Sequence, residues 1–380
     1  MNKRLIHIRR LTALLLLVFS SIASAEAVFS RVAKVVAVGD LHGDYEQYIR
    51  VLEANNLVNK KLKWAAGDIH FVQLGDVTDR GPDSFKIIRH LMKLEKQAKK
   101  AGGRVHVLIG NHEAMNIQTD LRFVHPGEYK ALVTKHSKKK QARYLDTVFR
   151  SMLVNQPELA DTASEIRTKL EKRFPLGYVE HRLLWEPGQE LAKWYAGHNT
   201  VIQINNTIYL HGGLDPHVDT YRALEEINEM IGRELEPGGQ PELSVSERGP
   251  LWYRGLAKNS ADEELEALNR MLEFYNADRI MVAHSPTMGA VMPRFDRKVI
   301  VADVGISAHY GGALANVVSE KGQWYAVHRG RKIELPLDEG VDDYLKQVAA
   351  LEPVGSKLAK YVQLKMANPA PKAAEMITID

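Results

Sequence analysis

The sequence contains no cysteine among its 380 residues. This absence excludes disulfide bonds, a cysteine-ligated zinc site and a lipid attached to a cysteine. It also excludes every phosphatase or protease that uses a cysteine nucleophile. Any catalysis by this chain must therefore use other groups.

Long apolar runs are absent except near the N-terminus. Residues 1–10 hold four basic residues and no acid, the uncharged run from Leu11 to Ile22 follows, and Ala23-Ser24-Ala25 comes next. This order is typical of a secretory signal peptide, and the run is shorter than the roughly 20 apolar residues of a membrane-spanning helix. We expect cleavage after residue 25, a periplasmic or secreted protein and no later membrane contact. The alternative is an uncleaved anchor.

An excess of positive charge is also absent from the rest of the chain. The formal net charge is +4, with 51 Lys and Arg against 47 Asp and Glu. The leader holds four of these cations, so residues 26–380 have 47 basic and 47 acidic residues. We therefore expect no nucleic-acid partner. The composition, 45% hydrophobic and 26% charged, is typical of a soluble globular protein.

The N-terminal third alternates strand and helix patterns. β-branched, apolar runs at 32–38, 69–74 and 104–109 predict buried strands, and helical spacing of apolar residues at 45–58 and after Pro82 predicts the helices between them. This alternation indicates an α/β fold with parallel strands.

The remainder differs in pattern. Residues 114–198 are polar and helical in pattern, and we interpret them as an insertion into a catalytic domain at 26–340. Residues 341–380 are expected to form a short helix near 341–351 and a poorly ordered tail. Further strand patterns lie at 200–210, 279–283, 298–303 and 313–318, followed by a strand pair that turns at Gly322 and ends near 334.

A basic cluster lies in the predicted insertion. It comprises Lys135, Lys138, Lys139, Lys140 and Arg143. We interpret it as a solvated helix face, and a substrate-binding patch is the alternative.

Three early strands end in a glycine followed by a residue type that binds metal ions. The segments are Gly39-Asp40-Leu41-His42-Gly43, Gly75-Asp76-Val77-Thr78-Asp79-Arg80-Gly81 and Gly110-Asn111-His112-Glu113. Ligands bind at the carboxyl ends of strands in α/β sheets. Asp, Asn and His side chains suit zinc, iron and manganese. The three segments together predict a metal site.

These segments resemble the signature of the calcineurin-like metallophosphoesterases, which reads GDxH, GDxxDRG and GNHE with two later histidines. His211-Gly212-Gly213 looks like the HGG block of the phosphoprotein phosphatase branch, and His284-Ser285-Pro286 supplies the second histidine. With the leader, the sequence is most similar to the Shewanella-like protein phosphatases, also described as bacterial tyrosine-specific metallophosphatases. The resemblance implies an α/β fold, a β-sandwich flanked by helices.

The resemblance also implies roles for individual residues. Asp40 and His42 would bind the first of two metal ions (manganese, zinc or iron), and Asp76 would bridge the two. The second ion would be completed by Asn111, His211 and His284. A metal-bound hydroxide would attack the phosphoester directly, without a phosphoenzyme.

Four further residues would act on the substrate. His112 would protonate the leaving oxygen, and Asp79 would orient it. Two arginines would bind the phosphate oxygens: Arg80 and Arg254, the second of which lies in the segment Leu251-Trp252-Tyr253-Arg254-Gly255.

Two departures from the family pattern narrow the interpretation. Leu108-Ile109 stands where eukaryotic members carry an arginine before GNHE. Ala283-His284-Ser285-Pro286 lacks the second histidine of the GHxH block, which favours phosphoprotein phosphatases over nucleases and cyclic-nucleotide phosphodiesterases.

Other candidates have ordinary explanations. We expect Glu113 to fix its loop by backbone hydrogen bonds, and Trp185, Trp194 and Trp252 to pack, although Trp252 beside Arg254 is also a candidate for the cleft. Tyr310 and His309 lie in the motif-like segment 307–312, and Asp303 is either a partner of the site or a turn residue. The remaining histidines are expected to be structural or on the surface: His70, His90, His106, His125, His136, His181, His198, His217 and His328.

The predicted function is that of a metal-dependent phosphomonoesterase acting on phosphoproteins, with phosphotyrosine preferred. The insertion at 114–198 is a candidate wall for an aromatic substrate. A hydrolase of nucleotides or dinucleoside polyphosphates is the main alternative. A binding module without catalysis is the third, and the complete ligand set argues against it.

Overall fold

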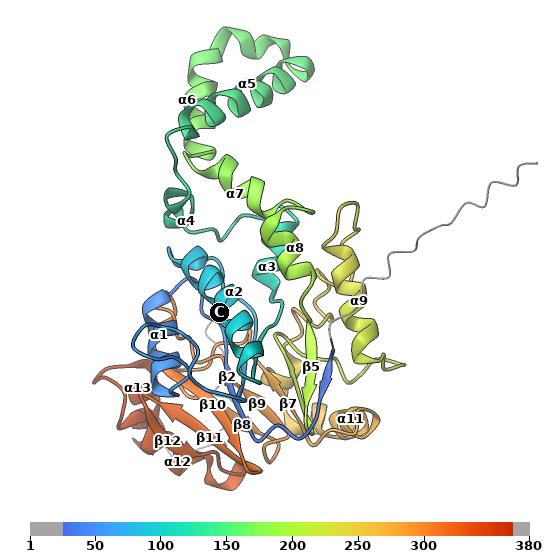
Figure 1. The fold of residues 1–380 in the computed structure, drawn as a ribbon, viewed down its shortest axis with the longest axis vertical. Coiled ribbons are helices and arrows are strands. Elements are labelled where there is room, and N and C mark those ends of the chain that lie inside the picture. The colour runs from blue at the N-terminus through green and yellow to red at the C-terminus, as the bar shows by residue number, and fades with distance from the viewer. Residues whose placement is uncertain (1–25, 368–380) are drawn as a thin grey trace, which may run out of the picture.

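The computed structural model describes residues 26–367, so the predicted leader and residues 368–380 lie outside the described part of the chain. Two six-stranded sheets form the body and helices flank them (Figure 1). This arrangement confirms the predicted α/β class. Among residues 26–367, no helix is both long enough and apolar enough to cross a membrane.

The first sheet has the strand order β12-β11-β10-β2-β3-β4. The early strands β2, β3 and β4 pair in parallel, as their alternation with helices predicted. Strands β10, β11 and β12 continue the sheet in antiparallel pairing. The bounds are β2 (Lys34–Val38), β3 (His70–Gln73), β4 (Arg104–Val107), β10 (Ala315–Glu320), β11 (Gln323–His328) and β12 (Arg331–Glu334).

The second sheet has the order β1-β5-β6-β7-β9-β8, in which β6, β7 and β9 are parallel. The strand pattern predicted at 200–210 is confirmed, and the structure adds a turn at Asn205, where φ is 52°, that divides the segment into the antiparallel hairpin of β5 and β6. The bounds are β1 (Val28–Phe29), β5 (Val201–Ile204), β6 (Thr207–Leu210), β7 (Arg279–Val282), β8 (Met292–Arg294) and β9 (Val299–Val301).

Helices cover the outer sides of both sheets. α2 packs against β4 and α9 packs against β5. α1 begins after Asp44, whose side chain accepts the Gln47 N–H, and it ends at Ala54, four residues before the predicted end. The helices of the body are α1 (Tyr45–Ala54), α2 (Ser84–Lys100), α3 (Asn111–Ile117), α8 (Glu190–Ala196), α9 (Leu224–Glu234), α10 (Gly255–Lys258) and α11 (Ala261–Phe274).

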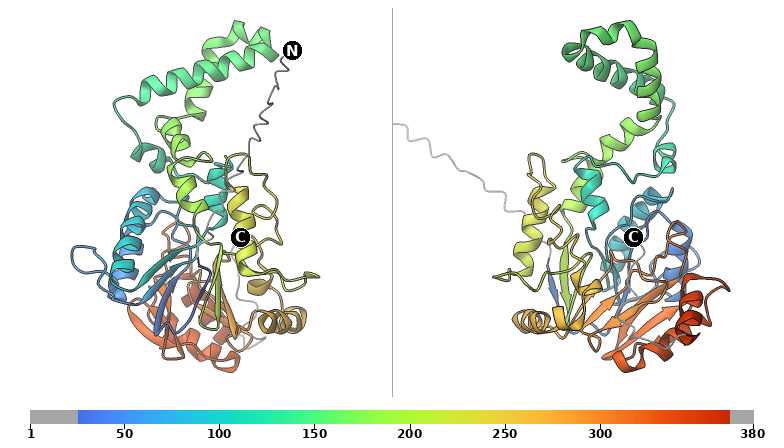
Figure 2. Two further views of the ribbon diagram at one scale, coloured as in Figure 1. Left: turned by 45° about the vertical axis from the view of Figure 1, so that its right-hand side comes forward. Right: turned by 180° about the vertical axis from the view of Figure 1, so that it is seen from behind.

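Helices between α3 and α8 form an arm that rises from the body (Figures 1 and 2). Its tip is the pair α5 and α6, and α4 and α7 form its base. Leu145, Phe149 and Leu170 make a small apolar cluster in the arm, separate from the main core. The bounds are α4 (Pro126–Ala131), α5 (Ser137–Asn155), η1 (Pro157–Thr162, a 3₁₀ helix), α6 (Ala163–Arg173) and α7 (Tyr178–Trp185).

The C-terminal region contains a helix that the sequence analysis missed. After η2 (Asp338–Gly340) and α12 (Val341–Ala349), a second helix, α13 (Lys357–Ala367), packs against α12. Leu358 and Val362 are its buried residues, one helical turn apart. The prediction of a poorly ordered tail directly after the first helix was therefore wrong, because so short an apolar stripe gives little periodic signal.

Candidate active site

The predicted metal ligands come together where the parallel strands of both sheets end. Asp40 and His42 follow β2, Asp76 follows β3 and Asn111 begins α3 just after β4. His211 follows β6 and His284 follows β7 in the other sheet. All six side chains are buried. The structure thus places every predicted ligand in one site.

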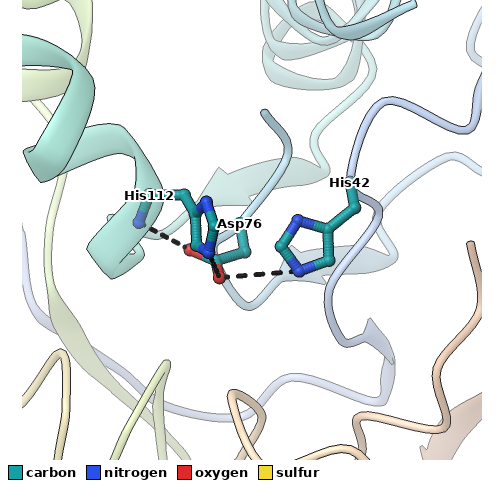
Figure 3. A group of neighbouring side chains, drawn as sticks. All are labelled: His42, Asp76 and His112. Atoms are coloured by element: carbon teal, nitrogen blue, oxygen red, sulfur yellow. Dashed lines mark hydrogen bonds and ion pairs between the residues drawn. The ribbon is translucent and has the colours of Figure 1, made fainter. Parts of the chain in front are cut away.

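Asp76 lies at the centre of this site. Its Oδ2 is 3.8 Å from His42 Nε2, 3.8 Å from His112 Nε2 and 3.4 Å from His211 Nε2. Figure 3 shows the rings of His42 and His112 turned toward this carboxylate. Two groups with the spacing of metal ligands share Asp76, one with His42 and His112 and the other with His211 and His284.

The outer hydrogen bonds of two imidazoles leave their inner nitrogens available. His42 Nδ1 lies 3.1 Å from the Thr78 carbonyl oxygen, and His211 Nδ1 lies 2.9 Å from the Leu74 carbonyl oxygen. In the neutral ring, the nitrogen that faces a backbone carbonyl carries the proton, so Nε2 is the nitrogen that can bind a metal ion. Backbone carbonyls orient metal-binding histidines in this way.

The electrostatics of the site favour a cation. Burial lowers the pKa of His42 and His211, but the neighbouring carboxylates outweigh it and raise each pKa to about 9. Burial favours the neutral form of Asp76, but the charges of His211 and His112 hold its pKa well below the usual range. Burial and the adjacent Asp40 raise the pKa of Asp303 well above its usual range.

The backbone at the site is unusual. His42, Asp76 and His284 have φ values of 43°, 54° and 62°, a left-handed conformation that costs about 1–3 kcal/mol for a residue with a side chain. A Cβ added at Gly110 would lie 2.2 Å from Asp76 Oδ1, so only glycine fits there. The surrounding structure must therefore hold these loops firmly.

Glu113 fixes these loops through backbone hydrogen bonds, as predicted. Its Oε2 accepts the N–H groups of Asp76 and Gly110, each at 2.9 Å. Its Oε1 accepts those of Val77 at 2.9 Å and Thr78 at 3.2 Å. One buried carboxylate thus fixes the loop after β3 to the start of α3.

His112 is held in a network beside Asp76. Its Nδ1 is 2.7 Å from Asp79 Oδ2, and its backbone N–H donates to Asp76 Oδ1 at 3.0 Å. Asn116 donates to the other oxygen of Asp79 at 2.9 Å. These contacts orient the ring so that Nε2 faces the centre.

Behind this network lies a residue that the sequence analysis missed. Glu128, fully buried in α4, accepts the Asp79 N–H at 3.0 Å and the Thr78 hydroxyl at 3.3 Å. Burial and the charge of Asp79 raise the pKa of Glu128 to about 8. No motif marks this glutamate, and its position became visible only with the fold.

A cavity of about 480 Å³ opens onto these residues. The predicted phosphate-binding residues Arg80 and Arg254 both line it. Arg80 lies over the Phe123 ring, 3.9 Å from its centroid, and Arg254 donates to the His284 carbonyl. The cavity is lined by Asp40, His42, Asp76, Arg80, Asn111, His112, Phe123, Trp252, Arg254, His284, Pro286, Asp303, His309, Tyr310 and Lys357.

Comparison with known proteins supplies the family. The profile of the calcineurin-like phosphoesterases matches residues 33–288. The chain belongs to the calcineurin-like phosphoesterase family. It is therefore a hydrolase of phosphate esters.

Relatives of this phosphoesterase support a phosphatase branch. An uncharacterised protein of Schizosaccharomyces pombe is 30% identical over 330 residues, which cover 82% of this chain and 86% of that protein. Shewanella-like protein phosphatase 2 of Arabidopsis thaliana is 27% identical over 313 residues, covering 76% and 75%. The crystal structure of a cold-active protein-tyrosine phosphatase of a psychrophile Shewanella species has a TM-score of 0.61 at 25% identity, covering 81% of this chain and 82% of that one.

The structure of this phosphoesterase also shows where the residues lie whose roles the sequence analysis left open. Tyr310 lines the cavity with its ring centroid 5.1 Å from that of His42, and His309 lies at the cavity beside it. Trp252 also lines the cavity, whereas Trp185 is fully buried elsewhere. Asp303 lies against Asp40 and accepts the Gly305 N–H at 2.9 Å, so it is both a partner of the site and a turn residue.

The histidines expected to be structural or on the surface do not line this cavity. His70 and His106 pair with each other at 3.1 Å, and His198 pairs with Glu95. The basic cluster of the predicted insertion also lies outside the cavity lining, and Lys140 pairs with Glu180 at 3.3 Å. Its other members are exposed.

Two cavity residues were missed from the sequence. Phe123 belongs to the loop between α3 and α4, and the only hint was an aromatic residue in a polar stretch. Lys357 belongs to α13, where the sequence analysis expected a disordered tail. Among residues 114–198, Phe123 alone lines the cavity. The insertion therefore does not form the predicted wall around the substrate, apart from this one side chain. Helices α5 and α6 lie at the far end of the arm from the body (Figure 1).

Proposed function

We propose that this phosphoesterase binds two metal ions and hydrolyses phosphotyrosine in proteins or peptides. The observation that carries the metal pair is the central position of Asp76, shared by two ligand groups. Asp40 and His42 would complete one position with Asp76. Asn111, His211 and His284 would complete the other.

The donor set fits such ions. His211 Nε2 lies 2.9 Å from Asn111 Oδ1 and 3.1 Å from His284 Nδ1, so the donor atoms of these three side chains face one another, and a metal ion between them would satisfy all three. The 3.8 Å distances from Asp76 Oδ2 to His42 Nε2 and His112 Nε2 are too long for hydrogen bonds. Carboxylate, imidazole and amide groups suit manganese, zinc and iron alike. When bound, the ions would activate water and stabilise charge on the phosphoryl oxygens.

His112 would act as the general acid. Its Nδ1 lies 2.7 Å from Asp79 Oδ2, a contact that orients the ring, and His112 lines the cavity. Nε2 would give its proton to the leaving oxygen. Asp79 would position the ring without reacting, and Asn116 and Glu128 would hold Asp79.

Arg80 and Arg254 would bind the phosphate oxygens. Their guanidinium groups are planar donors suited to two oxygens at once. Arg80 Nε is buried and has no hydrogen-bond partner among the described residues, so a donor remains for a ligand. The stacking of Arg80 on Phe123 fixes the plane of the group.

Aromatic residues in the cavity support phosphotyrosine as substrate. Phe123, Trp252 and Tyr310 line it together with the two arginines. Aromatic pairs contribute about 0.5–1.5 kcal/mol beyond their buried area. The Shewanella protein of similar structure is a protein-tyrosine phosphatase.

The test uses the chain from residue 26, purified and loaded with manganese. kcat/KM is compared on a phosphotyrosine peptide, a phosphoserine peptide and a dinucleoside tetraphosphate, and bound metal is counted by mass spectrometry. We expect two ions per chain and a preference for phosphotyrosine. Preference for the dinucleotide would overturn the substrate, and a single ion would overturn the metal pair. The variant Asp76→Asn, which weakens both metal positions, serves as the inactive control.

We also propose that the protein is exported to the periplasm or beyond. The support is the sequence of residues 1–25, with a basic start, an apolar run and small residues before the cleavage position. Expression of the full chain in a bacterium, followed by osmotic release and N-terminal sequencing, tests this proposal. A mature terminus at Glu26 in the released fraction is expected, and an intact Met1 in the cytoplasm would contradict it.

A further inference from the structure

Lys357 is a cation in the cavity lining for which the proposed reaction has no use. In the proposed reaction, Arg80 and Arg254 would already bind the phosphoryl group, and the two metal ions would add more positive charge. Lys357 comes from α13, beyond the segment 33–288 that the family profile matches. The cavity therefore has a further positive group at a place specific to the C-terminal part of this chain.

Contacts of the neighbouring residues hold the backbone of Lys357 in place at the start of α13. Leu358, the next residue, is fully buried, and Ser356 Oγ accepts the Ala359 N–H at 3.2 Å. Lys357 Nζ donates to the Tyr310 carbonyl at 3.4 Å. The Tyr310 ring in turn lies 5.1 Å from the ring of His42, a proposed metal ligand.

The charge of Lys357 is available to a ligand. Among residues 26–367, no carboxylate forms an ion pair with it, whereas Lys365 on the same helix pairs with Asp342. Lys357 is exposed, and its hydrogen bond to the neutral Tyr310 carbonyl is at the long end of the hydrogen-bond range. An anion approaching the mouth would replace this weak contact with a charged one.

We propose that Lys357 forms a second anion subsite at the mouth of the cavity. It takes the carboxylate of an Asp or Glu that flanks the phosphorylated tyrosine of the substrate. This inference rests on the proposed function. The phosphate enters toward Asp76, the substrate ring lies along Tyr310, and the adjacent peptide residues emerge beside Lys357. A second phosphate of a nucleotide has the same chemistry, and the experiment separates the two.

The experiment uses two phosphotyrosine peptides that differ only in one flanking residue, Glu or Gln. kcat and KM are measured for the wild type, Lys357→Ala, Lys357→Glu and the control Lys360→Ala, which changes an exposed lysine on the same helix outside the cavity lining. The wild type should have a lower KM for the Glu peptide than for the Gln peptide, with a similar kcat. Lys357→Ala should reduce the Glu/Gln ratio of kcat/KM ~2–5-fold, the range of an exposed ion pair.

Further variants and conditions test the electrostatic origin. Lys357→Glu should reverse the preference, Lys360→Ala should keep the wild-type ratio, and high salt should reduce the wild-type preference. Binding of the matching non-hydrolysable phosphonate peptides gives the same ratio without turnover. A dinucleoside tetraphosphate serves as the nucleotide arm.

The outcomes separate the two proposals. Failure of the wild type to turn over either peptide would overturn the proposed function. Turnover with equal ratios in the wild type and Lys357→Ala would overturn the subsite alone. A loss with Lys357→Ala on the dinucleotide but not on the Glu peptide would assign the lysine to a second phosphate and overturn the peptide assignment.

Discussion

The centre around Asp76 and the arm of α5 and α6 hold charged side chains in opposite ways. At the centre, carboxylates and imidazoles are buried and packed against one another, and Glu113, for example, accepts four backbone N–H groups. On the arm, Lys138, Lys139 and Arg143 are exposed. A buried charge is tolerated only with partners, whereas an exposed one needs none.

The two regions also differ in what stabilises them. The centre is part of the main core that joins both sheets, and the arm has a small apolar cluster of its own. A cluster this small gives a low local stability. We therefore expect changes at the centre to act on catalysis and on the whole fold, and changes on the arm to act locally.

The largest expected difference is in kcat, between replacing a histidine at the centre and replacing a histidine on the arm. Replacing His112 by alanine should lower kcat on an alkyl phosphate by about 10²–10⁴-fold, because the leaving oxygen loses its proton donor. Replacing the exposed His136 of the arm should leave kcat within error. Steady-state kinetics on both variants checks the pair, and equal kcat for wild type and His112→Ala would contradict the assigned role. An aryl phosphate should respond less, since its leaving group needs less protonation.

The second contrast concerns two buried phenylalanines. Phe71→Ala in β3 should cost about 3–5 kcal/mol of global unfolding free energy, because a fully buried ring leaves a cavity. Phe149→Ala should instead release the arm, with faster amide hydrogen exchange in α5 and α6 and little change in the global transition. Denaturation curves and hydrogen exchange by mass spectrometry measure both effects. A full-sized global loss from Phe149→Ala would show that the arm folds as one unit with the body.

The third prediction concerns the base of the arm at acid pH. His181 in α7 is fully buried among Phe85, Tyr129 and Trp185, and burial and Arg182 lower its pKa to about 3. The unfolded chain binds a proton here near pH 6.5 and the folded chain does not, so stability falls as pH drops below 6.5. Between pH 7 and pH 5 the loss is about 2 kcal/mol.

The variant His181→Phe isolates this loss. Its unfolding free energy should fall less than that of the wild type between pH 7 and pH 5, and His136→Phe, at an exposed position, should behave as the wild type does. Identical pH dependence in wild type and His181→Phe would refute the prediction.

The smallest expected effect is at the basic cluster. Lys138→Ala and Lys139→Ala together should change stability by no more than ~0.5 kcal/mol each, as for other exposed surface positions. Turnover of p-nitrophenyl phosphate should stay the same, since neither residue lines the cavity. A large rise in KM for a phosphopeptide alone would revive the patch interpretation of this cluster.

The same contrast explains which features the sequence could predict. That the side chains from Asp40 to His284 come together was predictable, because each follows a strand pattern in a short motif whose residue types suit metal binding. Glu128 and Phe123 were not, since each reaches the site from a loop or helix that carries no motif. The hairpin turn at Asn205 was overlooked within an apolar run, and the asparagine pair there was the available signal.

Lys357 illustrates a further limit. Its place at the cavity depends on α13 folding back beside the loop that holds Tyr310, a contact between segments 47 residues apart. Periodicity reports which face of a helix is buried, and it carries no information about what the first residue of that helix will face.

The position of the centre between two sheets has a consequence for when it forms. Asp40 and Asp76 come from the first quarter of the chain, and His284 comes from beyond residue 280; the His284 N–H reaches Asp40 Oδ1 at 3.3 Å. Contacts of such sequence separation form slowly. The N-terminal strands alone cannot supply all six proposed ligands, so the proposed metal site is complete only after the second sheet has docked. We therefore expect that a nascent or truncated chain hydrolyses no phosphate ester until both sheets have folded together.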